Sequence, residues 1–185
     1  MKNLFLAIKI PIPSELEWAV DEIQGSFKFI DARWVELRNM HMTLKFFGPI
    51  NESRQKKIIS TLEQFFKNKE IFDITICKLA MFGSKGSPKT LWLGIEEEDF
   101  MKTLAADIQK ELDKLGLFAD RQNFVPHISM ARISKTNSSS FFQKQLKNYR
   151  VISMDDLEIR SVFLLESIIS KNSVEYKLVK EFKLR

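Results

Sequence analysis

The sequence predicts a duplicated α+β fold whose two halves are related by an approximate two-fold axis. Two observations predict it. Strand-like and helix-like segments follow one another in the same order twice, over roughly residues 1–88 and 89–185, and each half carries one histidine on a strand, His41 and His127. No linker or charge run divides the 185 residues, so we expect one domain made of two pseudo-repeats.

In the first half, residues 3–10 alternate as a strand does, and prolines at positions 11 and 13 end it. Ser14 is then expected to cap a helix that carries Gly25 near its end. A short strand over residues 31–37 follows. These segments account for the chain up to the first histidine.

The first histidine lies in a strong strand candidate, residues 40–47, which Gly48-Pro49 is expected to close. Asn51 or Ser53 opens the next helix, whose apolar residues recur on one face. A long strand over residues 71–82 completes this half.

The second half repeats the order after a loop at residues 83–88. Residues 90–95 are predicted to be a strand, and helical spacing predicts a helix over residues 97–115 that Gly116 terminates. The remaining predictions are the second histidine strand at residues 125–133, a helix capped within residues 137–140 that ends near Asn148, and two last strands at residues 157–166 and 174–184.

Composition narrows the class of protein. The chain is 44% hydrophobic and can bury a core, but its apolar runs are too short to span a bilayer. Lys9 interrupts the apolar start and no small-residue cleavage site follows, so we expect a cytoplasmic protein rather than a signal peptide. The single cysteine, Cys77, excludes a disulfide framework and is expected to be a buried, inert thiol. A net charge of +5 suits a polyanion such as RNA, although many basic proteins bind none.

The only two histidines share a local pattern. Each is followed two positions later by a hydroxyl residue, His41 by Thr43 and His127 by Ser129. On a strand, residues i and i+2 project from the same face, so each imidazole is expected beside a hydroxyl while the residues between them point into a core. The alternative is that both are core histidines whose hydrogen bonds are satisfied within the fold. In that case a hydroxyl residue would follow each of them at the second position by chance. If the strands meet, two imidazoles and two hydroxyls line one cleft.

Such a cleft suits phosphodiester cleavage. A histidine with a pKa near ~6.5 can act as acid or base close to neutral pH, and hydrolysis needs both roles. The hydroxyls can donate hydrogen bonds to the non-bridging phosphate oxygens. Because acid, base and charge stabilisers are all side chains, we expect no metal and no cofactor. Two histidines without an acidic residue at ligand spacing also make a poor metal site.

Two basic residues follow the motifs. Arg132 lies three positions after Ser129, so it needs a twist or bulge to reach the same face. Lys45 shares the face of His41 and Thr43 by the two-residue period, and it suits either a phosphate contact or a solvated position at the rim.

The motifs resemble the 2H phosphoesterase superfamily and, within it, the RNA 2′,3′-cyclic phosphodiesterases, historically called 2′-5′ RNA ligases. The resemblance covers most of the chain and rests on four segments, residues 39–48, 89–94, 124–132 and 162–167. Ser129 stands where that family more often has Thr; it keeps the hydroxyl but is less stiff about its first torsion angle.

The resemblance implies a bilobal α+β fold, with two antiparallel sheets around a central cleft and helices packed outside. It implies hydrolysis of RNA 2′,3′-cyclic phosphate ends to 2′-phosphomonoesters, with O3′ leaving and with reversible 2′-5′ ligation as a further activity. His41 is implied as the proton donor and His127 as the proton acceptor, while Thr43, Ser129 and Arg132 hold the phosphate.

Two aromatic residues, Trp34 and Phe47, are candidates to stack on a base, although aromatic residues of the core or rim are the simpler interpretation. The expected partners are RNA ends or small cyclic nucleotides, with no membrane, and the expected state is a monomer. Two alternatives stay open. One is a nucleotide-binding module that has lost turnover, and the other is an enzyme for a small cyclic nucleotide or an ADP-ribose cyclic phosphate.

Overall fold

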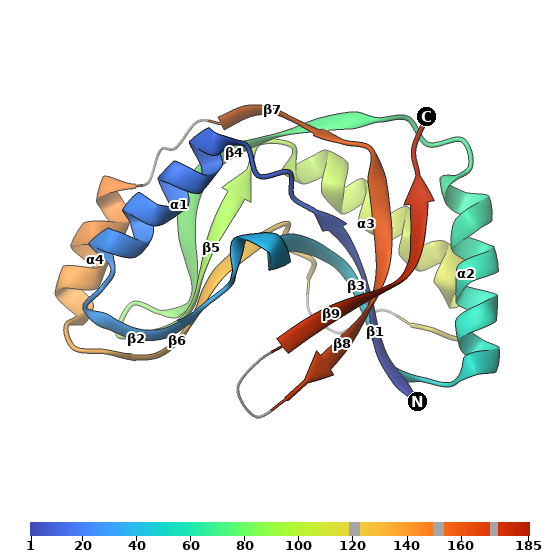
Figure 1. Cartoon of the computed structure of the whole chain (residues 1–185), viewed down its shortest axis with the longest axis horizontal. Helices are drawn as coiled ribbons and strands as arrows, with labels where there is room; N and C mark the ends of the chain where they lie inside the picture. Colours follow the sequence, from blue (N-terminus) through green and yellow to red (C-terminus); the bar gives the residue numbers. More distant parts are fainter. Residues whose placement is uncertain (119–122, 150–153, 171–173) are drawn as a thin grey trace.

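The computed structural model describes residues 1–118, 123–149, 154–170 and 174–185, in which nine strands form one curled antiparallel sheet with four α-helices (Figure 1). The elements are, in chain order, β1 (Lys2–Lys9), α1 (Ser14–Ser26), β2 (Ile30–Trp34), a 3-10 turn (Leu37–Asn39), β3 (His41–Ile50), α2 (Glu52–Phe66), β4 (Phe72–Ser84), β5 (Ser87–Ile95), α3 (Glu98–Asp113), β6 (Ile128–Thr136), α4 (Ser139–Asn148), β7 (Met154–Ile159), β8 (Ser161–Ile169) and β9 (Val174–Lys183). None of the described helices is long and apolar enough to cross a membrane.

The sheet divides into two lobes. Its hydrogen-bonded order is β7-β4-β5-β6-β3-β1-β8-β9, with β2 paired to β6. The lobes meet where Met42 of β3 pairs with Ile128 of β6, the one pair that joins these strands in the described residues. Figure 1 shows α1 and α4 on one side of the molecule and α2 and α3 on the other. The predicted bilobal α+β fold is confirmed, and the two expected sheets are continuous through this pair.

The lobes do not coincide with the two halves of the chain. β4 follows α2 but pairs with β5 and β7, and β8, from the second half, pairs with β1. Phe27, at the end of α1, packs edge-on against Phe142 of α4. Each lobe therefore contains elements from both halves, and the duplication of residues 1–88 and 89–185 stays a prediction.

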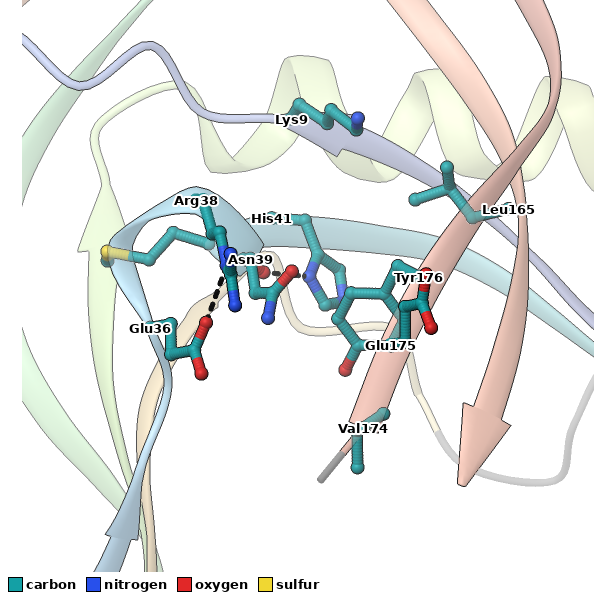
Figure 2. Close-up of a pocket in the computed structure, with 10 residues that line it drawn as sticks. Lys9, Glu36, Arg38, Asn39, His41, Leu165, Val174, Glu175 and Tyr176 are labelled. Carbon is teal, nitrogen blue, oxygen red and sulfur yellow. Dashed lines mark hydrogen bonds and ion pairs between the residues drawn. The ribbon is translucent and has the colours of Figure 1, made fainter. Parts of the chain in front are cut away.

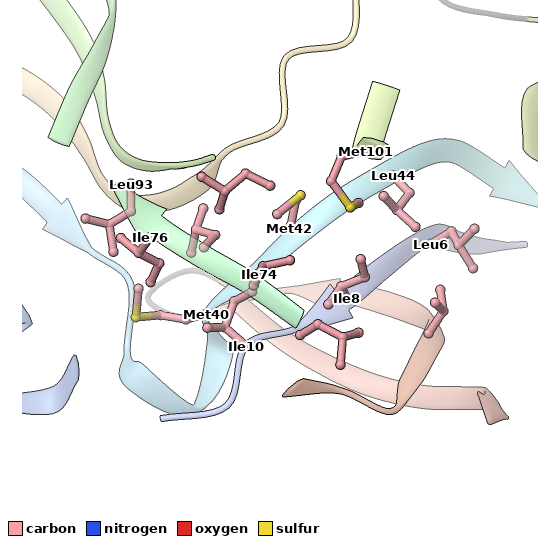
Figure 3. Close-up of a cluster of buried hydrophobic side chains, with 14 of the residues drawn as sticks. Leu6, Ile8, Ile10, Met40, Met42, Leu44, Ile74, Ile76, Leu93 and Met101 are labelled. Carbon is pink, nitrogen blue, oxygen red and sulfur yellow. The ribbon is translucent and has the colours of Figure 1, made fainter. Parts of the chain in front are cut away.

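Alternation along β1 separates two apolar regions. Leu4, Leu6 and Ile8 enter the main core, while Phe5 and Ala7 point to the other face and form a second cluster with Leu165 of β8. The main core extends through both lobes, and Figure 3 shows side chains from β1, β3, β4, β5 and α3 meeting there. The second cluster lies on the side of the sheet that carries His41.

The N-terminal caps of three helices were predicted from the sequence, and two of these predictions are confirmed. Asn51 caps α2 by accepting from the Arg54 N–H, and Ser138 caps α4 by accepting from the Phe141 N–H, as predicted. The expected cap at Ser14 is wrong. Pro13 is the N-cap of α1 without a side-chain hydrogen bond, since proline's fixed φ suits the start of a helix.

Four predicted strand boundaries are corrected. β3 does not close at Gly48-Pro49 but runs through it, because Gly48 takes a φ of +70° where the β1–β3 register shifts. The predicted loop at residues 83–88 is mostly strand, since Ser84 and Ser87 still pair and leave only a two-residue turn. The strand predicted from residue 125 begins at Ile128 instead. The predicted strand 157–166 is two strands, β7 and β8, separated at Arg160.

We expect Met42→Ala to lower the free energy of unfolding by roughly 2–5 kcal/mol, because it empties a fully buried site at the junction of the lobes. Leu178→Ala, on β9 and 51% exposed, should change it by less than about 0.5 kcal/mol. Urea denaturation followed by circular dichroism measures both. Equal losses in the two variants would contradict the role given to the junction.

Candidate active site

The pairing between β3 and β6 sets the orientation of both histidine motifs. Met42 and Ile128 are 0% exposed and belong to the main core. Because side chains alternate along a strand, the residues on either side of each point away from the core. His41 begins β3 and His127 immediately precedes β6, so both imidazoles project from the face of the sheet opposite the main core, which we call the cleft face.

The same pairing brings the two motifs together. In an antiparallel ladder, the Met42–Ile128 pair places His41 opposite Ser129 and Thr43 opposite His127. Directly opposed residues have Cβ atoms about 5 Å apart, and diagonal neighbours are about 7–8 Å apart. The imidazoles are therefore diagonal neighbours across the β3–β6 pair, with a hydroxyl beside each.

Each imidazole is held by the backbone two residues before it. His41 Nδ1 lies 2.7 Å from the Asn39 carbonyl oxygen, as Figure 2 shows, and His127 Nδ1 lies 2.8 Å from that of Val125. A carbonyl only accepts hydrogen bonds, so Nδ1 is the donor in both rings. Nε2 is then the atom that accepts a proton in the neutral ring or donates one in the charged ring.

Aromatic rings pack against both histidines. The centroids of Phe5 and Tyr176 lie 5.2 and 5.0 Å from that of His41. Those of Phe82 and Trp92 lie 4.8 and 5.9 Å from that of His127. No sequence pattern predicted this packing, because these partners come from β1, β9, β4 and β5.

Burial shifts the proton affinity of both rings. It lowers the pKa of His127 below the usual 6.5, against a smaller rise from the bond to Val125. Burial is also the main cause of the lowered pKa of His41, which its bond to Asn39 partly offsets.

Nearby positive charges lower the pKa of His41 further. They belong to His127, Arg132 and Lys9 in decreasing order of effect. This coupling places the second motif's histidine and arginine within electrostatic reach of His41.

A bulge brings Arg132 to the cleft face. Arg132 pairs with Thr90 and Ser129 pairs with Trp92, while Met130 between them has no partner on β5. Thr90 and Trp92 are two apart on β5 and share a face, so Arg132 and Ser129 share one as well. The bulge that the sequence required is therefore present.

A second bulge turns Lys45 away from the histidines. Thr43 pairs with Ala7 but Lys45 pairs with Leu6, so Leu44 is the extra residue. Lys45 therefore leaves the face of Thr43, and its Nζ donates to the Phe118 carbonyl. The expectation that Lys45 shares the motif face is wrong, because the two-residue period breaks at Leu44.

The bulge also decides which of two neighbouring phenylalanines lies on the cleft face. Phe46 now pairs with Phe5, whose ring centroid is 5.9 Å away, and it is 60% exposed on the cleft face. Phe47 is unpaired at the next register shift and packs against the main core. Phe46 is thus an exposed aromatic of the cleft that the sequence did not single out.

The other stacking candidate, Trp34, lies apart from the histidines. It pairs with the fully buried Ala131 on β6 and packs against the main core. Its neighbour Arg33 pairs with Arg132 and takes the cleft face instead. The structure brings together His41, His127, Thr43, Ser129 and Arg132, but it does not bring Trp34 or Phe47 to them.

A pocket of about 430 Å³ opens beside His41 (Figure 2). Its walls come from the segment around the 3-10 turn, from the start of β3 and from β1, β8 and β9. It is lined by Lys9, Glu36, Arg38, Asn39, Met40, His41, Leu165, Val174, Glu175 and Tyr176. A pocket of this size can hold a small ligand.

Cys77 lies on β4, outside this group. It is partly buried, and burial raises the pKa of its thiol, which disfavours the reactive thiolate. Among the described residues no three His, Cys, Asp or Glu side chains gather as metal ligands would.

Solved structures share the fold over nearly the whole chain. A Thermus thermophilus protein, TT0787, aligns with a TM-score of 0.78 and 22% identity, covering 99% of this chain and 98% of its own. Escherichia coli LigT, solved in complex with 3′-AMP, aligns with a TM-score of 0.75 and 19% identity over 99% and 98% of the two chains.

Proteins related in sequence also match most of this chain. The Aquifex aeolicus RNA 2′,3′-cyclic phosphodiesterase is 31% identical over 84% of this chain and 83% of its own. The Methanocaldococcus jannaschii protein of the same name is 24% identical over 97% and 99% of the two chains. The family model described as the 2′-5′ RNA ligase superfamily matches residues 12–166. The resemblance seen in the sequence is confirmed, and the chain belongs to the 2′-5′ RNA ligase superfamily.

Proposed function

We propose that this protein is an RNA 2′,3′-cyclic phosphodiesterase that hydrolyses cyclic phosphate ends to 2′-phosphomonoesters. One observation carries the proposal. Two imidazoles lie diagonally across the β3–β6 pair, and each donates Nδ1–H to a backbone carbonyl, so Nε2 is the ring atom available for proton transfer. The relatives that carry this name support the choice of substrate.

In the proposed reaction, His127 Nε2 takes a proton from water as the water oxygen bonds to phosphorus. The P–O3′ bond breaks, and His41 Nε2–H gives its proton to O3′. The phosphate stays on O2′, and a proton exchange between the histidines and solvent restores the starting state. The assignment of donor to His41 and acceptor to His127 comes from the family resemblance.

Three side chains are proposed to hold the phosphate. Thr43 and Ser129 present hydroxyls on the cleft face, where they can donate to the non-bridging oxygens. Arg132, exposed on the same face, offers two parallel N–H groups to the same anion. Because these groups supply acid, base and charge stabilisation, the proposed chemistry uses no metal and no cofactor.

We further propose that Phe46, rather than Phe47 or Trp34, stacks on a base of the substrate. Its exposure on the cleft face supports this role. Action as a monomer in the cytoplasm and reversible 2′-5′ ligation also belong to the proposal; the single cysteine suits a reducing compartment.

Replacing either histidine tests the acid–base pair. We expect His41→Ala and His127→Ala each to lower kcat on RNA ending in a 2′,3′-cyclic phosphate by roughly 10²–10⁴-fold, with unchanged circular dichroism. Assays in EDTA should leave the wild-type rate intact. Full activity in either variant, or a 3′-phosphate product, would contradict the mechanism.

A substrate with sulfur in place of O3′ separates the two roles within the same experiment. A thiolate leaves without a proton, because its conjugate acid is far more acidic than an alcohol. His41→Ala should therefore recover most of its loss on this substrate, and His127→Ala should not. If only His127→Ala recovers its rate on this substrate, His127 is the proton donor and His41 is the proton acceptor.

The pH profile follows from the lowered pKa values. The base must be neutral and the acid protonated, and both histidines of the free enzyme have pKa values below 6.5, so kcat/KM should peak on the acid side of 6.5. Lys9→Gln removes a positive charge near His41, which favours the imidazolium, so the limb of the profile that reports the pKa of His41 should move to higher pH. NMR titration of the two ring Cε1–H signals measures each pKa; values above 6.5 in the free protein would refute this account.

Phe46→Ala is expected to raise KM for the RNA substrate by roughly 5- to 150-fold, since stacking on a base contributes about 1–3 kcal/mol. The free energy of unfolding should stay nearly unchanged, because the ring is exposed. Phe47→Ala is the matched control: it should destabilise the fold with little effect on KM. The reverse pattern would restore Phe47 as the stacking residue.

A further inference from the structure

Arg33 faces the cleft but has no part in the proposed chemistry. It lies directly opposite Arg132 in the β2–β6 ladder, and both side chains are exposed. Its neighbours Ala32 and Trp34 pack against the main core, so the alternation of β2 sends Arg33 to the other face. Two guanidinium groups therefore project side by side from adjacent strands.

This arrangement is unfavourable without an anion. Like charges directly opposite each other destabilise a strand pair. Within the described ranges, the side chains of Arg33 and Arg132 make no ion pair and no hydrogen bond. The acidic residues nearby in sequence lie elsewhere, since Glu36 pairs with Arg38 and Asp31 is opposite Lys135.

The strand pairing places the two arginines on the side of the sheet that carries the histidines: Arg132 shares a face with Ser129, and Arg33 lies opposite Arg132. Burial raises the pKa of Tyr176, and the positive charges of Arg132 and Arg33 act against that rise. The Tyr176 ring in turn contacts the His41 ring at 5.0 Å between centroids. Arg33 is therefore within electrostatic reach of the residue that covers the candidate proton donor.

The number of positive charges exceeds what one phosphodiester needs. A 2′,3′-cyclic phosphate carries a single negative charge, and Arg132 together with a protonated His41 already opposes it. An RNA end brings a second charge one nucleotide away, on the phosphate that joins the last nucleotide to the one before. Opposed side chains start about 5 Å apart, so two long arginines on neighbouring strands can reach adjacent phosphates.

We propose that Arg33 binds this second, internal phosphate and so makes the protein prefer RNA ends over nucleoside 2′,3′-cyclic monophosphates. The inference rests on the proposed function and assigns its substrate class. Arginine suits the role because its planar, permanently charged head binds phosphate through two parallel hydrogen bonds.

Two substrates test the proposal: a nucleoside 2′,3′-cyclic monophosphate and a short oligoribonucleotide with the same terminal base and cyclic phosphate. Arg33→Gln should lower kcat/KM for the oligonucleotide by roughly 10- to 100-fold, as expected for a lost charged hydrogen bond. Its kcat/KM for the mononucleotide should stay within about twofold, since the internal phosphate is missing from it.

Salt dependence gives an independent readout. Losing one phosphate contact should make the slope of log(kcat/KM) against log salt shallower by about 0.7 for the oligonucleotide, with no change for the mononucleotide. Arg33→Lys should recover part of the loss. Arg160→Gln, which removes the same charge from an exposed arginine paired with Glu158 at the β7–β8 junction, should change neither substrate.

The outcomes separate this inference from the function on which it rests. If wild-type protein cleaves neither substrate, the proposed function fails. If wild-type protein cleaves both and Arg33→Gln lowers both equally, Arg33 belongs to the catalytic phosphate site and the inference is wrong. It is equally wrong if Arg33→Gln changes neither rate.

Discussion

The pairing of β3 with β6 is the contact on which the candidate site depends. Met42 and Ile128 form the junction of the two lobes, and both are fully buried in the core that runs through them. Their burial fixes which side of each strand faces inward, and the flanking motif residues must then face the cleft. A slip by one residue would bury both imidazoles and expose the junction, which hydrophobic burial opposes. The interaction that closes the fold thus also assembles the two histidines.

The surroundings of the histidines set their chemistry through burial rather than through acidic partners. A carboxylate at Nδ1 would orient each ring but would also raise its pKa by favouring the imidazolium. The backbone carbonyls of Asn39 and Val125 orient the rings without a full charge, and burial then lowers both pKa values. At mildly acidic pH, both protonation states of the imidazoles are therefore populated. The neutral ring can accept a proton, and the charged ring can release one. This is the combination that a two-histidine acid–base mechanism needs.

Irregularities in the strands decide which charged and aromatic groups reach the cleft. The bulge at Met130 turns Arg132 toward Ser129, and the bulge at Leu44 turns Lys45 away and Phe46 inward. Arg33 reaches the same face because β2 pairs with β6. The cleft face is therefore more basic and more aromatic than the two histidine motifs alone suggest, as expected of a surface that binds a nucleic acid end.

The amino-acid sequence was enough to predict the α+β class, nearly all the elements and the central chemical pattern. The paired histidines with same-face hydroxyls follow from the two-residue period of a strand, and the need for a bulge before Arg132 follows from its odd spacing. Local rules failed at Ser14, at Gly48-Pro49 and at the boundary between β7 and β8, because a backbone conformation or strand pairing outweighed local preference. Only the pairing of the strands in the tertiary structure decided that Phe46 and Arg33 lie on the cleft face. The same pairing places Phe47, Trp34 and Lys45 away from that face. The physical reason is that one bulge reverses every later side chain on a strand, and bulges depend on pairing with strands that are distant in the sequence.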